Sequence, residues 1–379
     1  MAFFDPSATD PAGARRSLWA VETSAPTLLR DLTTLRLGGP AGRLVEASDE
    51  DTVVDAVRRA DRAGEPLLVL AGGSNVVVAD AGFPGTVVRI ATRGVARTEG
   101  PGGEALLEVQ AGEPWDPVVA RCVDEGLAGV ECLAGIPGSV GATPIQNVGA
   151  YGQEVSDTIR SVRVLDRERD TLEALAPEAC GFSYRSSALK RTPGRWVVLA
   201  VTFALERSLR SAPIRYAELA RRLGVALGDS APLADVREAV LALRRGKGMV
   251  IDPADPDSVS AGSFFTNPVL DADAFAALER RVADRLGDGV VPPAFPDADG
   301  HIKTSAAWLI ERAGFHRGHG DPHGIAISGK HTLALTNRGR GTTAELVALA
   351  REIAGGVRDR FGVELVPEPV FVGHAWSGA

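Results

Sequence analysis

Hydrophobic residues recur at the three-to-four-residue spacing of amphipathic helices in several stretches of the chain. In the first, 48–64, an acidic start precedes a face of valines and Gly64 supplies the stop. The last, 343–361, opens with a capping box of Thr342 and Glu345 and ends at Gly362. The same spacing predicts further helices over 114–126, 216–223, 233–245, 275–286 and 306–312.

Other apolar runs are short and bounded by turn residues, which predicts strands. Runs 67–70 and 76–78 flank a glycine turn. Because strand 67–70 follows helix 48–64, the opening of the chain is predicted to be a βαβ-like unit. Two runs, 159–166 and 171–175, predict a hairpin. Further strands are predicted over 85–91, 105–111, 196–205, 331–337 and 363–372, and the mixture of elements predicts an α+β protein.

The stretch 133–153, LAGIPGSVGATPIQNVGAYGQ, holds five glycines, two prolines and no charged side chain. Such turns let backbone N–H groups approach a ligand, so this stretch could hold a pyrophosphate without a lysine. A tightly packed crossing between elements is the alternative. A second turn, 71–75, joins two strands instead of opening a helix, unlike the GxGxxG of a Rossmann fold. The two turns together suggest a different flavin-binding architecture.

Composition narrows the class of protein. The chain has 379 residues, enough for two or three structural units, and its net charge of −8 argues against a nucleic-acid surface. Its three cysteines form no CxxC pair, which fits a reduced compartment. The N-terminus has acids and prolines where a signal peptide needs an apolar core, and no apolar run could cross a bilayer. We therefore expect a cytoplasmic protein with neither nucleic-acid nor membrane partners.

Five motifs in order resemble those of one family: GGSNVVV, AGIPGSVGATPIQNVGAYG, FSYRSS, AGSFFTNP and PEPVFVG. The family is UDP-N-acetylenolpyruvoylglucosamine reductase, also called UDP-N-acetylmuramate dehydrogenase, a flavoenzyme of bacterial cell-wall synthesis. The similarity runs from Leu35 to Gly373. It implies a flavin fold of the vanillyl-alcohol-oxidase/PCMH type, noncovalent FAD, NADPH as hydride donor and UDP-N-acetylglucosamine enolpyruvate as substrate.

The resemblance also divides the chain. Residues 1–25 are expected to form an N-terminal arm, and 246–362 a smaller α+β substrate-binding domain. Between them lies an FAD-binding region, 26–245, with two subdomains of about 26–95 and 96–245, joined by a C-terminal strand within 363–379. The protein is expected to be a monomer.

The two glycine-rich turns supply the expected FAD contacts, mostly through backbone N–H groups. From the first turn we expect Gly72, Gly73, Ser74, Asn75 and Val76 to line the cofactor. From the second we expect Gly135, Ile136, Pro137, Gly138, Ser139, Gly141, Ala142, Gln146, Asn147 and Gly149.

Ser263 lies between a glycine and two phenylalanines in the AGSFF motif. No GxSxG elbow surrounds it, so a hydrolase nucleophile is not indicated, and spacing alone favours a turn serine. The resemblance implies instead that Ser263 donates the proton that completes reduction of the enolpyruvyl double bond.

Arg185 and Glu368 could form an ordinary ion pair across two strands. Alternatively, the planar arginine suits a substrate carboxylate, and a nearby glutamate can support enolate charge or proton flow. The resemblance places both in the active site, with Tyr184 lining it. Several relatives carry an arginine where this chain has Val370, so the charge pattern around Glu368 differs here.

Arg244, Arg245 and Lys247 cluster at a helix end, where the macrodipole alone favours cations. Such cations also suit the pyrophosphate of a nucleotide sugar. The resemblance assigns Lys247 and Tyr216 to that pyrophosphate, with Arg244 and Asn267 also binding substrate. Tyr216 lies in a segment typical of the branch that closes a tyrosine-bearing loop over the substrate.

The loop 316–324 contains His316, His319, Asp321 and His323, which invites a metal-site interpretation. No fourth histidine or cysteine lies near, so we expect no metal. The family places a polar side chain near the sugar here, and the sequence leaves open which residue takes that role.

The leading hypothesis is an FAD-dependent reductase that uses NADPH, with Arg185 and Glu368 steadying the enolate and Ser263 protonating it. One rival is an oxidase of the same flavin fold. Those enzymes often tether flavin through a histidine, and the two glycine-rich stretches contain none. The other rival, a non-catalytic flavin or nucleotide carrier, leaves those three residues without a role.

Overall fold

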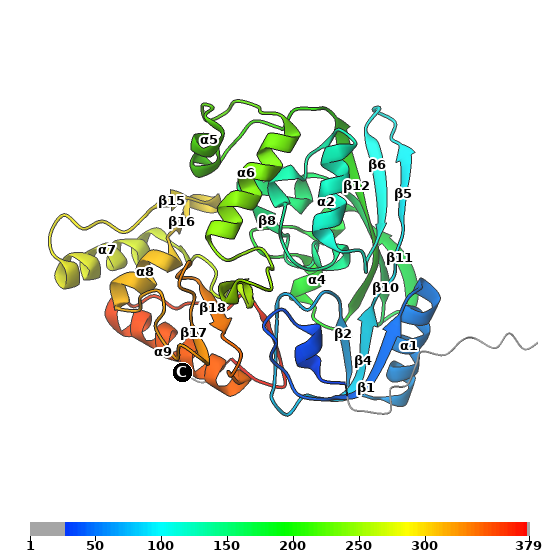
Figure 1. Cartoon of the computed structure of the whole chain (residues 1–379), viewed down its shortest axis with the longest axis horizontal. Coiled ribbons are helices and arrows are strands. Elements are labelled where there is room, and N and C mark those ends of the chain that lie inside the picture. Colours follow the sequence, from blue (N-terminus) through cyan, green and yellow to red (C-terminus); the bar gives the residue numbers. More distant parts are fainter. Residues whose placement is uncertain (1–26, 377–379) are drawn as a thin grey trace, which may run out of the picture.

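The computed structural model describes residues 27–376, which form a mixed α+β protein (Figure 1). The α+β prediction is therefore confirmed. The N-terminal arm predicted over 1–25 lies outside the described residues. Among residues 27–376, no helix is both long and apolar enough to cross a membrane.

The first unit is a small parallel sheet in the order β1-β4-β2, made by β1 (Ala41–Ala47), β4 (Phe83–Ile90) and β2 (Leu67–Leu70). Helix α1 (Glu50–Ala63) packs on it with its buried valines. Asp49 caps the start of α1, and Gly64 ends it in the left-handed conformation. The predicted βαβ-like opening is thus present, although β1 itself was not predicted as a strand.

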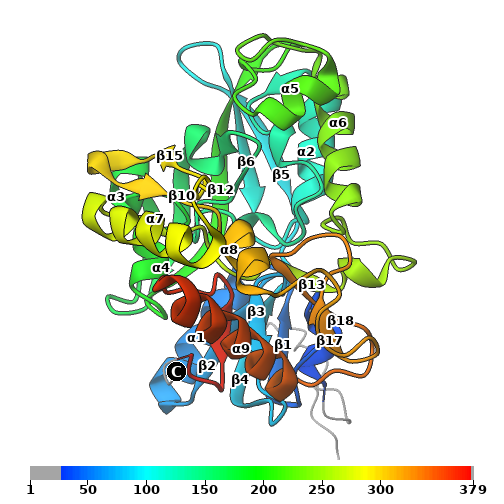
Figure 2. The same cartoon turned by 90° about the vertical axis from the view of Figure 1, so that its left-hand side faces the viewer.

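The second unit is an antiparallel sheet in the order β11-β10-β12-β6-β5. Its strands are β5 (Val95–Glu99), β6 (Ala105–Gln110), β10 (Ile159–Asp166), β11 (Thr171–Leu175) and β12 (Trp196–Arg207). The β10–β11 hairpin has the predicted ends. Helices α2 (Trp115–Asp124), α5 (Ala217–Leu223) and α6 (Leu233–Gly246) lie beside this sheet in the upper part of the molecule (Figures 1 and 2).

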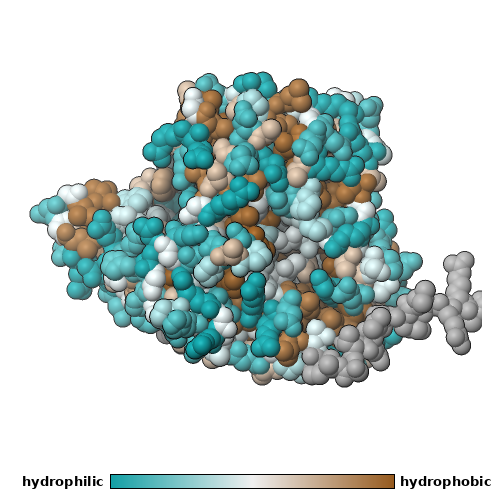
Figure 3. Space-filling model, viewed as in Figure 1, coloured by the Kyte–Doolittle hydropathy of each residue, from teal (hydrophilic) through white to brown (hydrophobic). Residues whose placement is uncertain are grey.

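The third unit contains α7 (Ala272–Leu286), α8 (Ala306–Ala313) and α9 (Thr343–Phe361). They surround a sheet of β13 (Ser260–Ser263), β18 (Ala334–Asn337) and β17 (Ile325–Ile327). A second small sheet joins β14 (Val269–Leu270), β16 (Ile302–Lys303) and β15 (Phe295–Pro296). One hydrophobic cluster serves these elements, and a larger one serves the second unit. The projection that contains α7 carries a small hydrophobic patch among hydrophilic residues (Figure 3). Val291, in the loop after α7, is exposed.

Short elements complete the described chain. They are β3 (Val76–Val78), β7 (Leu127–Ala128), β8 (Gly149–Ala150), β9 (Gln153–Glu154), α3 (Pro177–Cys180), α4 (Ala188–Arg191) and β19 (Val370–Val372). Single 3₁₀ turns occur at Leu29–Leu32, Glu131–Leu133, Val140–Ala142, Val155–Asp157, Pro256–Ser258 and Ala298–Gly300.

The C-terminal strand is much shorter than predicted. Only β19 pairs in register, parallel to β3, so the prediction of a strand over 363–369 is wrong. The alternating burial of 363–365 belongs to an extended segment that crosses the molecule. Pro367 and Pro369 have no N–H to donate and therefore prevent a continuous ladder. The pairing of β19 with β3 still brings Glu368 beside the first glycine turn.

Candidate active site

The two glycine-rich turns lie against each other. A Cβ added to Gly72 would lie 2.6 Å from the Cα of Gly138, and one added to Gly138 would lie 2.6 Å from the Ser74 hydroxyl. Gly73 has φ +61, and a Cβ there would collide with the Leu32 carbonyl. Side chains at these positions would therefore force the turns apart.

Both turns present unused backbone donors. Within the described part of the chain, the N–H groups of Gly72, Gly73, Ser74 and Asn75 donate to no protein acceptor, and neither do those of Ile136, Gly138 and Ser139. Unpaired N–H groups in adjacent turns form an anion-binding cradle, because their dipoles converge on one ligand. This donor set fits a pyrophosphate and needs no lysine.

Contacts with neighbouring elements fix the second glycine turn. Asp116 in α2 accepts the Gly135 N–H at 2.7 Å and pairs with Arg237 of α6 at 3.0 Å. Gly141 packs against Ala111, where an added Cβ would lie 2.5 Å from the alanine Cβ. The 3₁₀ turn Val140–Ala142 therefore holds its shape by contacts on the side away from the free donors.

Asn75 links three distant segments. Its side-chain amide donates to Gln146 at 2.7 Å and to the Glu368 carbonyl at 3.3 Å. Its own carbonyl accepts the Val370 N–H at 2.9 Å. This side chain therefore connects the first turn to the second and to the segment that carries Glu368, with Val76 next to it in β3.

Arg185 lies in a tight turn. Ser183 and Ser186 exchange backbone hydrogen bonds of 3.0 and 3.1 Å around it, and Arg185 has φ +52, a conformation that a residue with a side chain seldom adopts. Its guanidinium donates to the carbonyls of Asn147 and Gly149 at 3.3 and 2.6 Å. Asn147 is buried and also left-handed, with φ +47, so two strained residues face each other here.

Glu368 completes a pair with Arg185. The Nε atom of Arg185 lies 3.5 Å from the Glu368 carboxylate, whose side chain is 14% exposed. Burial raises the pKa of the Glu368 carboxyl above its ordinary value, and the charges of Arg185 and Lys190 partly offset that rise. Val370, two residues further along, is half exposed at 50%.

Ser263 ends β13 beside this pair. The next residue, Phe264, accepts the Glu368 N–H at 2.8 Å and donates its own N–H to the Leu333 carbonyl at 2.7 Å. Thr34 ties the start of β13 to the first turn, because its hydroxyl donates to the Ser260 carbonyl at 2.7 Å. Among residues 27–376, nothing hydrogen-bonds to the Ser263 hydroxyl, so it remains available to a ligand.

Tyr184 lies on the same turn as Arg185, and its ring faces the amine of Lys303. The Lys303 amine lies 4.7 Å from the centre of the Tyr184 ring, which favours a cation–π contact. Burial raises the pKa of Tyr184, while Arg185 and hydrogen bonds with Asn267 oppose the rise. Asn267 also accepts the first N–H of α8, from Ala306, at 3.0 Å. Tyr184 and Asn267 therefore lie together, as their common assignment requires.

Lys247 and Tyr216 belong to a second cluster, where α5 meets the end of α6. The Lys247 amine pairs with Glu218 at 2.7 Å and lies 5.7 Å from the Tyr151 ring, which meets the Tyr216 ring edge-on at 5.4 Å. Burial alone lowers the pKa of Lys247, but the Glu218 hydrogen bond and Tyr151 outweigh it and leave the pKa raised. Tyr216 is 43% exposed and precedes α5 directly.

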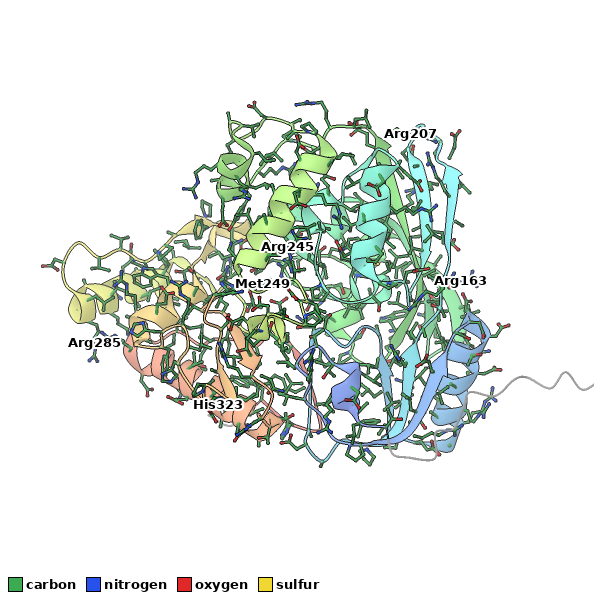
Figure 4. All side chains as sticks on the ribbon, viewed as in Figure 1. Arg163, Arg207, Arg245, Met249, Arg285 and His323 are labelled. Carbon is green, nitrogen blue, oxygen red and sulfur yellow. The ribbon has the colours of Figure 1, made fainter. Side chains whose placement is uncertain are left out.

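Arg244 is buried behind the second glycine turn. It donates to the Met249 carbonyl at 2.9 Å, its Nε has no partner, and Gly135 leaves room for it (Figure 4 labels Met249 at this end of α6). Burial lowers the pKa of its guanidinium to about 10. An incompletely paired buried cation favours an anionic ligand nearby.

The loop 316–324 shows no metal cluster. Across residues 27–376, no three histidine, cysteine, aspartate or glutamate side chains are grouped to hold a metal ion. His319 contacts Glu352 of α9 at 3.2 Å, and His323 lies at the periphery (Figure 4). Burial, followed by the charges of Lys247 and Arg317, lowers the pKa of His331 to about 4. The charges of Lys247 and of Arg317, from this loop, therefore both act on His331.

Comparison with known proteins bears on this arrangement. Residues 253–372 match the family model described as UDP-N-acetylenolpyruvoylglucosamine reductase, C-terminal domain, and residues 41–174 match that of an FAD binding domain. The UDP-N-acetylenolpyruvoylglucosamine reductase of Thermobifida fusca is 60% identical over 345 residues, 91% of this chain and 96% of that protein. The chain belongs to the UDP-N-acetylenolpyruvoylglucosamine reductase family.

Other members of this reductase family are also similar to this chain along most of its length. The protein of that name from Streptomyces coelicolor is 58% identical over 361 residues, 95% of this chain and 93% of the relative. The solved reductase from Thermus caldophilus shares the fold, with a TM-score of 0.61 and 23% identity across 93% of this chain and 100% of that one. The protein is therefore an FAD-dependent oxidoreductase, and the N–H groups of its two glycine turns fit that cofactor.

Sequence reasoning missed several residues at the reductase site. Lys190 and Lys303 lie beside the Arg185 turn, and Tyr151 and Glu218 contact Lys247. Lys190 follows FSYRSS by a few positions and could have been found by its proximity in sequence. Tyr151 lies within the glycine-rich stretch 133–153 and could have been found there. Lys303 and Glu218 are brought in by folding, and their local sequence carries no signal.

A cavity with a volume of 860 Å³ lies elsewhere. It is lined by 28–40 together with residues of the 253–259 and 337–342 loops. None of the residues assigned to FAD or substrate lines it. A smaller cavity of 260 Å³ does reach Gly72.

Proposed function

We propose that this protein uses NADPH and FAD to reduce UDP-N-acetylglucosamine enolpyruvate to UDP-N-acetylmuramate, a peptidoglycan precursor. The observation that carries the proposal is the junction of three groups. Arg185 pairs with Glu368, and the backbone of Glu368 bonds to Phe264, the residue that follows the unbonded Ser263. The Asn75 side chain ties Glu368 to the first turn of free N–H groups. Family membership supports the reductase assignment.

The cofactor is proposed to be held noncovalently by the two glycine turns. Bound FAD supplies the hydride chemistry between NADPH and substrate. The free N–H groups of 72–75, together with those of Ile136, Gly138 and Ser139, would hold its pyrophosphate, and the Asn75–Gln146 contact keeps both turns in place. Neither glycine-rich stretch offers a histidine for a covalent tether, which disfavours an oxidase.

The chain's own groups then act on the substrate. Arg185, held by two carbonyls, binds the enolpyruvyl carboxylate and stabilises the enolate formed when hydride adds to the terminal carbon. Glu368 lies against Arg185 and orients it. Ser263 donates a proton to the adjacent carbon, because its hydroxyl has no competing protein acceptor.

The second cluster is proposed to hold the diphosphate of the substrate. Lys247 and Tyr216 contact it, Arg244 adds charge from behind, and Tyr184 and Asn267 line the path toward Arg185. In loop 316–324 we assign the sugar-side role to Arg317, because its charge, like that of Lys247, acts on His331. Tyr216 is exposed, as expected of a side chain that closes over a ligand.

The proposed domain organisation follows the hydrophobic clusters. The FAD-binding region, 26–245, and the substrate-binding domain, 246–362, have largely separate cores, and β19 returns to β3 in the first unit. We further propose that the enzyme is a cytoplasmic monomer.

A spectrum tests the proposed function. Purified protein should show flavin absorption that NADPH bleaches under anaerobic conditions. Addition of the enolpyruvyl sugar nucleotide should restore the colour faster than oxygen does. An oxidase would be recoloured fastest by oxygen, and a carrier would not be bleached.

A further inference from the structure

The Arg185 turn carries a second cation for which the proposed reaction has no role. Lys190 lies in α4, directly after the turn, and its side chain is half-buried. Its amine donates to the Arg185 carbonyl at 3.0 Å. Burial lowers the pKa of this amine, and the charge of Glu368 opposes that decrease. Lys190 therefore lies within electrostatic reach of both members of the Arg185–Glu368 pair.

The turn needs such a contact because its conformation is unfavourable. Arg185 occupies the left-handed region, with φ +52, where glycine is the usual residue. Strain of this kind persists only when surrounding contacts fix the backbone. The Arg185 side chain is fixed by the carbonyls of Asn147 and Gly149, and Lys190 fixes the Arg185 carbonyl. The side chain and the backbone carbonyl of Arg185 are thus both fixed by hydrogen bonds.

The electrostatics of Glu368 point to the same residue. Two cations act on its carboxyl, Arg185 and Lys190, and the nearby Tyr184 phenol feels the charge of Glu368. Arg185 approaches no closer than 3.5 Å, which is long for a charge-assisted hydrogen bond. A second cation therefore matters for the ionisation of this carboxyl.

We propose that Lys190 is a positioning residue: it locks the strained carbonyl of Arg185 and supplies the second positive charge beside Glu368. The proposal deepens the proposed function, on which it rests for its catalytic meaning. Its structural content, a charge acting on Glu368, can be measured without substrate.

Infrared titration of the flavin-loaded protein tests the proposal directly. The carboxyl band of Glu368, assigned by its loss in Glu368→Gln, should titrate about one pH unit higher in Lys190→Met than in the wild type, because one nearby cation is removed. Lys190→Arg should restore most of the wild-type titration. Should Lys190→Met fold poorly, Lys190→Gln removes the same charge with a polar side chain and should give the same upward shift.

Arg191→Met is the matched control. Arg191 lies on the same short helix, and its guanidinium contacts Ser186 and Gly181 but neither Arg185 nor Glu368. Its loss should leave the Glu368 titration in place. An unchanged titration in Lys190→Met, or an equal shift in Arg191→Met, would overturn the proposal. A wild-type enzyme that the enolpyruvyl substrate cannot recolour would instead overturn the proposed function, and the titration result would still stand.

Discussion

At the scale of single residues, the side chains proposed to bind substrate are held by protein contacts, whereas the proposed proton donor is not. Arg185 has its donors anchored on backbone carbonyls and Glu368, whereas Ser263 has an unbonded hydroxyl. Lys247 is held at the other end of the site by Glu218. These different environments predict different kinetic effects for substitutions that look equally severe on paper.

Ser263→Ala should divide the reaction into two halves. Bleaching by NADPH needs no proton at substrate carbon and should stay near normal, whereas recolouring by enolpyruvyl substrate should slow roughly 10²- to 10⁴-fold, as expected for loss of a general acid. Stopped-flow absorbance measures both halves. Ser263→Cys, which keeps a proton donor, should be milder. Equal slowing of both halves would mean that Ser263 shapes the flavin pocket, and normal recolouring would point to Glu368 as the donor.

Lys247→Met should weaken substrate binding. Loss of a charged contact of about 1.5–3 kcal/mol corresponds to a rise in apparent KM of roughly tenfold to a hundredfold. Arg245→Met is the control, because Arg245 is an exposed cation at the same helix end that contacts Glu238. If both variants keep the wild-type KM, Lys247 is only a helix-end cation.

At the scale of elements, helices and strands were predicted correctly where the sequence itself marks their ends with capping residues, glycines or turns. Helix α9 has its capping box and terminal glycine, and the β10–β11 hairpin pairs as predicted. Strands without alternation were missed: β5 is nearly all exposed, and β13 is built from serine, alanine and glycine. The strand predicted from Val363 was wrong because buried and exposed residues alternate there, as in a strand, but no neighbouring strand pairs with 363–369.

Gly72→Ala tests the contact between the two turns. An added Cβ would lie 2.6 Å from Gly138, so the turns must move apart and their N–H groups diverge. Affinity for FAD, measured by fluorescence titration of the apoprotein, should fall roughly tenfold or more. Gly355→Ala, in α9, has room for its methyl group and should bind FAD normally. Unchanged affinity for FAD in Gly72→Ala would show that the two turns do not bind the cofactor jointly.

At the scale of the whole molecule, the site depends on contacts that no local pattern reveals. The Asn75 side chain reaches the Glu368 carbonyl across 293 positions of sequence, and Thr34 reaches Ser260 across 226. The ordered motifs identified these residues as members of one family site. Their mutual geometry, and the partners Lys190, Lys303 and Glu218, emerge only when the three units pack.

Packing of the units also half-buries His331, which makes stability depend on pH. Its folded pKa of about 4 lies below the ordinary value of 6.5, so the unfolded chain binds the proton more tightly. The lowered pKa of His331 contributes to the free energy of unfolding fully above about pH 6.5, and this contribution is lost as the pH falls toward 4. Melting temperature should drop across that interval less steeply in His331→Gln than in the wild type. Parallel curves for the two proteins would contradict this assignment.

The central claim, that the site reduces an enolpyruvyl sugar nucleotide at the expense of NADPH, is tested most directly by the product. Anaerobic incubation of limiting NADPH with excess UDP-N-acetylglucosamine enolpyruvate should yield, by mass spectrometry, a product heavier by two hydrogen atoms. Its amount should equal the NADPH consumed. NADPH oxidation that requires oxygen and leaves the sugar nucleotide unchanged would contradict the account.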